Sequence, residues 1–355
     1  MSRALVRFFD GHNDVLLSLH LTGLGPEPFV EGRPFGHLDL ARARAGGFVA
    51  GCFAIFVPAH DQRDPHLPPV PLRDPPYAQP LAPPIDPADA PREAAAMIDL
   101  LFELERASGG ELVVAREMAA VEAAVDGGPI AAVLHFEGAE PIDSSLDNLE
   151  QLYERGLRSV GLVWSRPNAF AEGVPFRFPA SPDTGPGLTA AGRELVSECN
   201  RLGILLDLSH LNERGFFDVA ELSEAPLVAS HSNAHALCAI TRNLTDPQLD
   251  EIGRSGGIVG ITVHAGMLRE DGRIDPATPL ERVLDHVDYV VGRIGAEHVG
   301  FGSDFDGAIV IDDIADAAGL PKLVDGLRAR GYANADIERL AHGNWLRVLR
   351  ATWRG

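Results

Sequence analysis

The residues with the clearest chemical potential lie near the start of the chain, in the segment DGHND at residues 10–14, which follows the apolar run at residues 5–9. Side chains two residues apart at the end of a strand point to the same side. His12 and Asp14 could therefore bind one metal ion together. Since a His-x-Asp triplet is common in proteins, this segment needs support from other parts of the sequence.

Further residues of the types that bind metal ions follow later apolar runs. They are Glu137 after residues 130–136, His210 after residues 204–208, His231 after residues 227–229 and Asp304 after residues 298–302. If these runs are strands of one parallel barrel, all of these residues lie at its C-terminal mouth, where such barrels carry their active sites. Three imidazoles with two or three carboxylates suit Zn²⁺, with Mn²⁺ or Co²⁺ as substitutes. Five ligands exceed the needs of one catalytic zinc, so the pattern predicts a two-metal site that shares one carboxylate.

Each of these residues also has an ordinary structural interpretation. An isolated buried histidine is more often a hydrogen-bonded core residue than a ligand. Asp14 or Asp304 could cap a helix or stand in a turn, and Glu137 could lie in a solvated loop. The same placement at several strand ends favours a metal site over separate coincidences.

The elements that would position these residues are short apolar runs that alternate with helical patterns. The eight runs cover residues 5–9, 48–57, 130–136, 159–163, 204–208, 227–229, 257–263 and 298–302. Helical periodicity lies between them, for example at residues 91–107, 188–202 and 280–294. Eight strands that alternate with helices predict an α/β protein, a (β/α)8 TIM barrel and not a doubly wound sheet. We expect one domain over residues 1–355.

Capping residues mark several predicted helix ends. Thr189 and Asp246 are expected to be N-caps, because their side-chain oxygens can accept hydrogen bonds from free backbone amides. Gly203 and Gly295 are expected to end helices, because glycine tolerates the left-handed conformation found there.

One proline-rich segment interrupts this alternation. Residues 58–91 contain twelve of the 27 prolines and predict an irregular excursion after the second strand. A linker between two domains is the alternative, but the apolar runs on both sides continue one barrel count. We expect an insertion that lies on the barrel or at a subunit contact, with a mobile loop as the competing interpretation.

Composition limits the partners. A formal charge of −21 argues against nucleic acid and anionic membranes, since both require basic patches. Lys322 is the only lysine, so Schiff-base chemistry or a carbamylated bridging lysine would depend on it. The three cysteines show no CxxC spacing, which predicts reduced thiols in a cytoplasmic protein. Neither a signal peptide nor a membrane-spanning stretch is predicted.

Several motifs together resemble one enzyme family. They are, in order, DGHND, EGAEPIDSSLDNL, LDLSH, SHSNAHALC with TRN after it, GSDFDG and the terminal GNWLRVL. The chain resembles the membrane (renal) dipeptidase family of zinc peptidases, family M19, over nearly its whole length. The resemblance implies a TIM barrel of the metal-dependent hydrolase type and a metallo-dipeptidase of the EC 3.4.13 type with two Zn²⁺ per chain. It also implies a homodimer, whereas the short N-terminus and polar C-terminal end predict a soluble, bacterial-type member without a lipid anchor.

The resemblance also implies residue roles. His12 and Asp14 would bind one zinc, His210 and His231 the other, and Glu137 would bridge both. Arg242, in the segment ITRNLTD, would bind the substrate carboxylate, although an exposed arginine is the ordinary alternative. Asp304 would transfer the proton, which with Glu137 makes it a catalytic residue.

The chemistry agrees with these roles. Two metal ions that share a water lower its pKa towards about 7 and supply hydroxide for attack on the scissile carbonyl. The Asp304 carboxylate can accept the proton and deliver it to the leaving amine. The planar Arg242 guanidinium matches a free carboxylate, which explains a preference for dipeptides over longer chains. The predicted substrates include dipeptides with a D-residue at the C-terminal position.

Two positions depart from the renal type of the family. A substrate-binding histidine after the fourth strand is replaced by Trp164, and a substrate-binding tyrosine after the seventh strand is replaced by His264. An indole accepts no hydrogen bond, so Trp164 would form an apolar wall. We expect the metal site to be unaffected and the preferred side chains to differ.

Two other functions compete with this prediction. A different metal-dependent amidohydrolase would act on a non-peptide amide or ester, but such enzymes more often use a His-x-His motif and a lysine carbamate. A catalytically silent peptide-binding member would have no use for all five ligands and Asp304.

Overall fold

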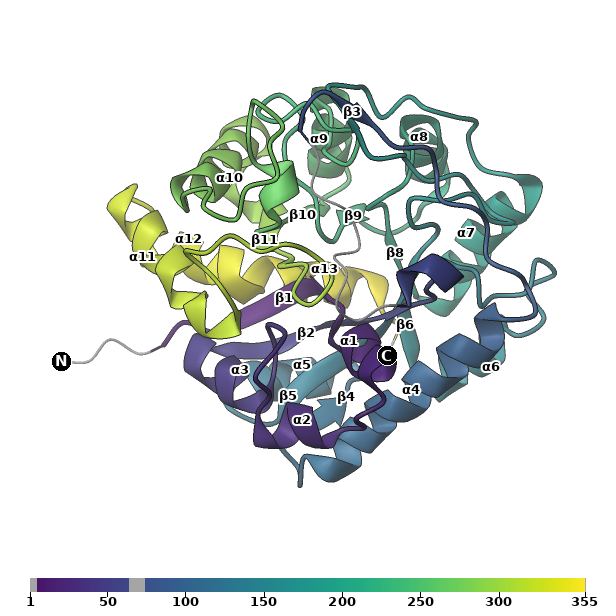
Figure 1. Cartoon of the computed structure of the whole chain (residues 1–355), viewed down its shortest axis with the longest axis horizontal. Helices are drawn as coiled ribbons and strands as arrows, with labels where there is room; N and C mark the ends of the chain where they lie inside the picture. The colour runs from purple at the N-terminus through teal and green to yellow at the C-terminus, as the bar shows by residue number, and fades with distance from the viewer. Residues whose placement is uncertain (1–4, 64–73, 355) are drawn as a thin grey trace.

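A computed structural model describes residues 5–63 and 74–354. Within these residues, nine parallel strands form one sheet, and eight of them close into a barrel that helices surround (Figure 1). The ninth, β4 (Leu112–Val114), pairs with β5 outside the ring. The barrel strands are β1 (Phe8–Asn13), β2 (Phe48–Phe56), β5 (Ile130–Glu137), β6 (Leu157–Gly161), β8 (Leu205–Asp207), β9 (Val228–Ala229), β10 (Ile258–Ile261) and β11 (Val299–Phe301). The ring closes because β1 pairs with both β2 and β11, and β2 pairs with β5. The predicted (β/α)8 barrel is confirmed.

Helices connect the strands and cover the outside of the barrel. They are α1 (Val15–Thr22), α2 (Glu27–Glu31), α3 (Leu40–Gly46), α4 (Ala90–Ala107), α5 (Met118–Val125), α6 (Leu149–Arg155), α7 (Ala190–Leu202), α8 (Glu213–Leu222), α9 (Asp246–Arg254), α10 (Glu281–Ile294), α11 (Pro321–Ala329), α12 (Asn334–Glu338) and α13 (Asn344–Thr352). Short turns of helix are η1 (His60–Gln62), η2 (Ala265–Met267), η3 (Ala296–His298), η4 (Ala317–Gly319) and η5 (Arg339–Gly343). In the parts of the chain that the structure describes, no helix is both long and apolar enough to cross a membrane.

The first strand differs from its prediction. The apolar run predicted residues 5–9, but β1 continues through the polar residues as far as Asn13, which is in register with Phe53 on β2. A strand ladder is made by backbone groups, so it does not require apolar side chains. His12 therefore lies within β1 and not after it. Each of the other seven predicted strands overlaps an observed one.

The predicted helix ends are correct with one exception. Thr189 accepts a hydrogen bond from the Gly192 amide at the start of α7, and Gly203 ends that helix in the left-handed conformation. Asp246 is not an N-cap: Thr245 precedes it and caps α9, and Asp246 is the first helical residue. The sequence TDPQ permits either residue to cap, and Thr245 also forms a capping box with Gln248.

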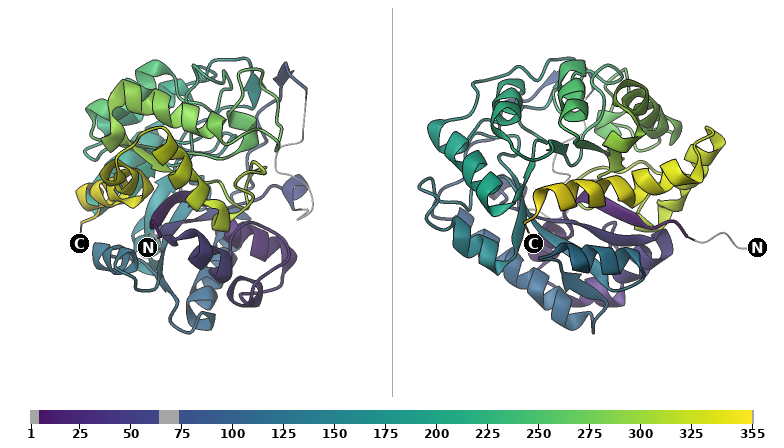
Figure 2. Two further views of the ribbon diagram at one scale, coloured as in Figure 1. Left: turned by 90° about the vertical axis from the view of Figure 1, so that its left-hand side faces the viewer. Right: turned by 180° about the vertical axis from the view of Figure 1, so that it is seen from behind.

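The barrel interior is filled from the end opposite the predicted site. The right-hand view of Figure 2, from behind the molecule, shows the yellow helix α13 lying across this end of the strands. Its Trp345 is fully buried, stacks on Phe9 with ring centroids 5.2 Å apart, and donates from Nε1 to Phe301 O. A Cβ at Gly11 would lie 2.4 Å from this indole, so only glycine fits there. The indole therefore fills the barrel interior at the end away from the predicted site.

The proline-rich segment contacts the loops at the barrel mouth. Its residues 64–73 lie outside the described part of the chain. In the remainder, β3 (Tyr77–Ala78) pairs antiparallel with β7 (Arg177–Phe178), which belongs to the loop after β6. Tyr77 and Phe178 also pack in a small apolar cluster with Met267. These contacts agree with the prediction that the proline-rich segment lies on the barrel. The assignment of the whole chain to a single domain stays a prediction.

Candidate metal centre

All five residues predicted as metal ligands lie together at the C-terminal mouth of the barrel. His12 belongs to β1 and Asp14 follows it. Glu137 is the last residue of β5, while His210 and His231 lie in the loops after β8 and β9. All five are buried. The parallel strand order brings these residues together from four separate parts of the sequence.

Glu137 stands between two groups of donors. Its Oε2 lies 3.7 Å from His12 Nε2, and His12 Nε2 lies 3.2 Å from Asp14 Oδ2. Its Oε1 lies 3.1 Å from His210 Nε2 and 3.7 Å from His231 Nε2. Oε2 of Glu137 therefore faces the group of His12 and Asp14, and Oε1 faces the group of His210 and His231.

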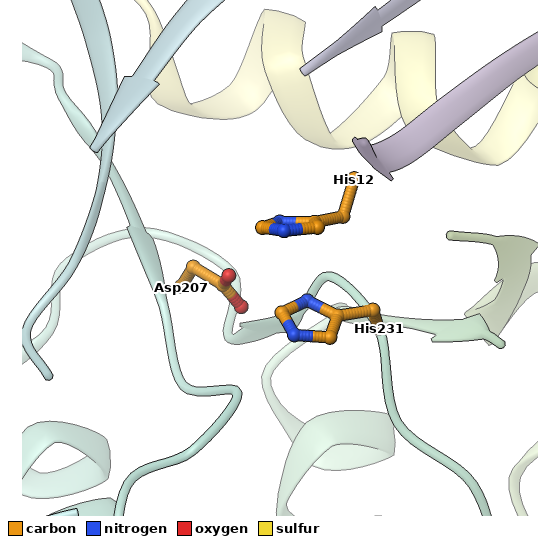
Figure 3. A group of neighbouring side chains, drawn as sticks. All are labelled: His12, Asp207 and His231. Carbon is orange, nitrogen blue, oxygen red and sulfur yellow. The ribbon is translucent and has the colours of Figure 1, made fainter. Parts of the chain in front are cut away.

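A further carboxylate, Asp207, belongs to the same cluster. It ends β8, and its oxygen lies within 4.8 Å of ligand atoms of His12 and His231. Figure 3 shows the three side chains pointing toward one another from separate elements of the barrel. The sequence prediction missed Asp207, although its place at a strand end, in the motif LDLSH, was the signal that selected Glu137.

Burial and charge set the protonation of the cluster. Burial raises the pKa of Glu137 well above its usual range, and the nearby charge of Asp14 raises it further. Burial lowers the pKa of both His210 and His231 well below the usual value, so both are neutral. Burial alone would lower the pKa of His12, but the charges of Asp14 and Glu137 raise it to about 10. Crowded carboxylates beside the neutral imidazoles of His210 and His231 suit a divalent cation.

Unpartnered atoms point to the same chemistry. Among the described residues, the buried His12 Nδ1 and Asp14 Oδ1 have no hydrogen-bond partner. Buried polar atoms are normally paired, so unpartnered ones need an explanation. The nitrogen and carboxylate donors of this cluster fit a divalent transition metal such as zinc.

Asp304 lies beside this cluster in a strained loop. Asp304 and Asp306 both have positive φ, 65° and 68°, as does His210 with 68°. Such a conformation costs about 1–3 kcal/mol for a residue other than glycine and persists only where surrounding contacts impose it. The Asp304 amide donates to His12 O over 3.1 Å, which ties the loop to β1. A Cβ at Gly307 would come 2.0 Å from Asp14 Oδ2 and 2.8 Å from Asp304 Oδ1, so glycine is needed between these carboxylates.

The three residues predicted to bind substrate have different surroundings. Arg242 is buried, and its Nη2 donates to His231 O over 3.1 Å. The Trp164 ring lies 5.7 Å from the His210 ring and 5.2 Å from the Phe56 ring. His264 follows β10, and its Nδ1 donates to Ile309 O over 3.2 Å. Arg242 and Trp164 thus contact histidines of the donor cluster directly. The imidazole of His264 instead donates its hydrogen bond to the loop after β11.

Two serines contact the outer nitrogens of the histidines. Ser165 Oγ lies 2.9 Å from His210 Nδ1, and Ser230 Oγ lies 2.8 Å from His231 Nδ1. Neither serine was predicted, because serine is common in loops and carries no metal signature. Only the folded arrangement reveals these contacts.

Comparisons with known proteins agree with this geometry. The sequence profile of the family described as Membrane dipeptidase (Peptidase family M19) matches residues 3–354. The chain is 46% identical over 255 residues, 72% of its length, to a Klebsiella pneumoniae protein named "Uncharacterized protein in pqqA 5'region", of which it covers 94%.

Two solved structures are also similar. A crystal structure of dipeptidase AC, a metallo peptidase of family M19, has a TM-score of 0.94 and 48% identity, with 99% of each chain covered. A metallo peptidase from Rhodobacter sphaeroides, bound to a phosphinate mimic of the dipeptide L-Ala-D-Ala, also has a TM-score of 0.94 and 48% identity. The superposition covers 99% of this chain and 100% of that one.

Proposed function

Because this chain belongs to the membrane dipeptidase family, peptidase family M19, we propose that it is a zinc-dependent dipeptidase that holds two metal ions. The family and its structural neighbours indicate a metallo-dipeptidase that uses a divalent metal. The observation that carries the binuclear form is Glu137, with one carboxylate oxygen toward His12 and the other toward His210 and His231.

Each group of donors would hold one ion. His12 and Asp14 form one position, His210 and His231 form the other, and Glu137 serves both. Two zinc ions so held would lower the pKa of a water molecule and polarise the scissile carbonyl. The protein itself provides the remaining steps.

Arg242 would bind the substrate carboxylate. Its guanidinium is buried beside His231, and burial lowers its pKa to about 10, which leaves it charged at neutral pH. A planar cation offers two parallel N–H donors to a carboxylate. A free C-terminal carboxylate close to the scissile bond is a property of dipeptides, so this contact selects them over longer peptides.

Asp304 would transfer the proton. Water attacks the carbonyl carbon, the Asp304 carboxylate takes a proton from this water, and the same proton passes to the nitrogen as the C–N bond breaks. Trp164 would form an apolar wall beside His210, and His264 would adjoin the substrate from the β10 side.

The substrate class includes dipeptides of the L-Xaa-D-Xaa type. The Rhodobacter sphaeroides relative, which binds a mimic of L-Ala-D-Ala, supports this choice. We further propose a single-domain cytoplasmic enzyme that forms a homodimer, with residues 58–91 as an insertion on the barrel.

The test is release of amino acids from a mixed library of L-Xaa-L-Xaa and L-Xaa-D-Xaa dipeptides by the zinc-loaded protein. We expect release that disappears in the Glu137→Ala variant, because that variant loses the shared carboxylate. No release from any dipeptide, with two zinc ions bound per chain, would contradict a dipeptidase and favour another amide or ester substrate.

A further inference from the structure

A chain of hydrogen bonds runs from Asp207 to the imidazole of His231. Asp207 Oδ1 accepts from the Ser209 amide over 3.0 Å and from the Ser230 amide over 2.8 Å. Asp207 Oδ2 accepts from the Ser230 hydroxyl. That hydroxyl oxygen in turn lies 2.8 Å from His231 Nδ1. Asp207, Ser230 and His231 are each at most 2% exposed.

The protons in this chain can be assigned from donor and acceptor chemistry. A carboxylate only accepts, so the single hydroxyl proton of Ser230 points to Asp207. Ser230 Oγ must then accept from His231, which places the imidazole proton on Nδ1. A neutral imidazole with its proton on Nδ1 has its lone pair on Nε2. That Nε2 is the atom that lies 3.7 Å from Glu137 Oε1.

We infer that Asp207 and Ser230 are positioning residues that fix the tautomer of His231 so that its Nε2 lone pair faces the metal centre. This inference rests on the proposed metal-dependent function for its purpose, but the tautomer itself is a property of the metal-free chain. A hydrogen-bond partner at the ring nitrogen that does not bind metal orients a metal-binding histidine and raises its basicity.

The other two histidines of the cluster lack such an arrangement within the described residues. The Ser165 hydroxyl can either donate to His210 Nδ1 or accept from it, because no carboxylate takes its proton. His12 Nδ1 is buried without a partner. His231 is therefore the histidine of this cluster whose Nδ1 contacts a hydroxyl that a carboxylate holds in place, and Ser165 provides a matched control.

Asp207→Asn is the most informative substitution. The two backbone amides at Oδ1 require an acceptor, so the asparagine oxygen must occupy that position and its NH₂ must face Ser230. The Ser230 hydroxyl would then accept from asparagine and donate to His231 Nδ1. The imidazole proton would move to Nε2 and occupy the lone pair that a metal needs.

The experiment records long-range ¹H–¹⁵N correlations of histidine side chains in the metal-free protein, with His231→Gln to assign the signals. We expect the Nδ1–H form of His231 in the wild type and in Ser165→Ala, and the Nε2–H form in Asp207→Asn. Competition with a chromophoric chelator should show zinc affinity reduced about 10- to 100-fold in Asp207→Asn.

Ser230→Ala tests the same inference if Asp207→Asn does not fold. Without the hydroxyl, His231 should show both tautomers, and zinc affinity should fall. An Nε2–H form in the wild type, or an unchanged tautomer in both variants, would overturn the inference. Failure of the zinc-loaded wild type to hydrolyse dipeptides would contradict the proposed function alone, because the tautomer is measured without metal or substrate.

Discussion

At the scale of single residues, the centre is organised around Glu137. Its two oxygens face different donor groups, with His210 Nε2 at 3.1 Å on one side and His12 Nε2 at 3.7 Å on the other. Burial raises the pKa of this carboxyl, so its charged form is costly in the metal-free protein. Bound cations would remove that cost, which links the geometry of Glu137 to the proposed pair of metal ions.

Arg242→Lys tests how the substrate carboxylate is bound. A lysine keeps the charge but loses the paired N–H donors, and hydrogen bonds to charged groups contribute about 1.5–3 kcal/mol. We expect kcat/KM for dipeptides to fall about 10- to 100-fold. Steady-state kinetics with a dipeptide and its C-terminal amide would measure the effect.

The amide is the internal control for Arg242→Lys. Because it has no carboxylate, the wild type and the variant should hydrolyse it at similar low rates. An equal loss on both substrates would show that Arg242 does not recognise the carboxylate.

The sequence could predict which proposed ligands lie together but not the residues behind them. His12, Glu137 and His231 stand at strand ends, and a parallel barrel brings strand ends together whatever the loops do. The inferred role of Ser230 depends on the direction of one hydroxyl proton, which Asp207 at the end of the neighbouring strand β8 accepts. No fixed separation between two residues in the sequence signals such a contact.

At the scale of elements, the loop after β11 is held by a buried ion pair. Arg33, between α2 and α3, pairs with Asp306, and the two side chains are 0% and 1% exposed. Asp306 also accepts from the His37 amide over 2.7 Å. These contacts impose the positive φ of Asp306, two residues after Asp304. The N-terminal part of the chain thus supports the proposed proton-transferring residue.

Arg33→Ala should destabilise the protein by about 3–5 kcal/mol, because it leaves the Asp306 carboxylate buried without a cation. Denaturant-induced unfolding would measure the free energy. Arg106→Ala is the control, since Arg106 pairs with Glu103 on the surface and should change stability by less than about 1 kcal/mol. A loss for Arg33→Ala as small as that of the control would show that the pair does not hold the loop.

His286 on α10 predicts a pH dependence of stability. It is buried, accepts from the Ala234 amide at Nδ1 and donates to Leu268 O from Nε2. Burial lowers its pKa to about 4, while the charges of Asp285 and Arg282 have smaller effects. Between about pH 6.5 and pH 4 the unfolded chain binds a proton that the folded protein does not. The contribution of the neutral His286 to the free energy of unfolding is therefore complete above the unfolded pKa. It falls by on the order of 3 kcal/mol as the pH drops through the folded pKa.

Unfolding free energies measured from pH 7 to pH 4 would show this effect as a slope. His286→Gln should be less stable at pH 7 and have a smaller slope on the acid side. His60→Gln, at an exposed position, should leave the slope unchanged. Equal slopes in the wild type and His286→Gln would contradict the assignment.

The limits of element prediction follow from what determines a strand. Apolar runs located seven strands, whose buried faces require such residues. The same rule ended the first strand at Phe9, although β1 extends to Asn13 through backbone pairing with β2. The irregular ladder between Asp10 and Asn13 is the point at which β1 carries polar residues, among them His12 of the candidate metal centre.

At the scale of the whole molecule, the two ends of the barrel differ. One is filled by apolar side chains, and the other carries the candidate metal centre. Trp345 from α13 fills the interior beside Phe9, and the candidate metal donors converge at the opposite mouth. Over that mouth, β3 of the proline-rich segment pairs with β7 from the loop after β6. The alternation of strands and helices predicted the barrel. The pairing of β3 with β7 could not be predicted, because it joins two irregular segments that show no periodic pattern in the sequence.

The most direct test of the proposed function is a titration of metal into chelator-treated protein while dipeptide hydrolysis is measured. We expect no hydrolysis without metal, a rate that rises with added Zn²⁺ and a plateau at two equivalents per chain. Glu137→Gln should stay inactive throughout, because it lacks the shared carboxylate. A full rate in metal-free protein, a plateau at one equivalent, or no hydrolysis with two ions bound would contradict a binuclear zinc dipeptidase.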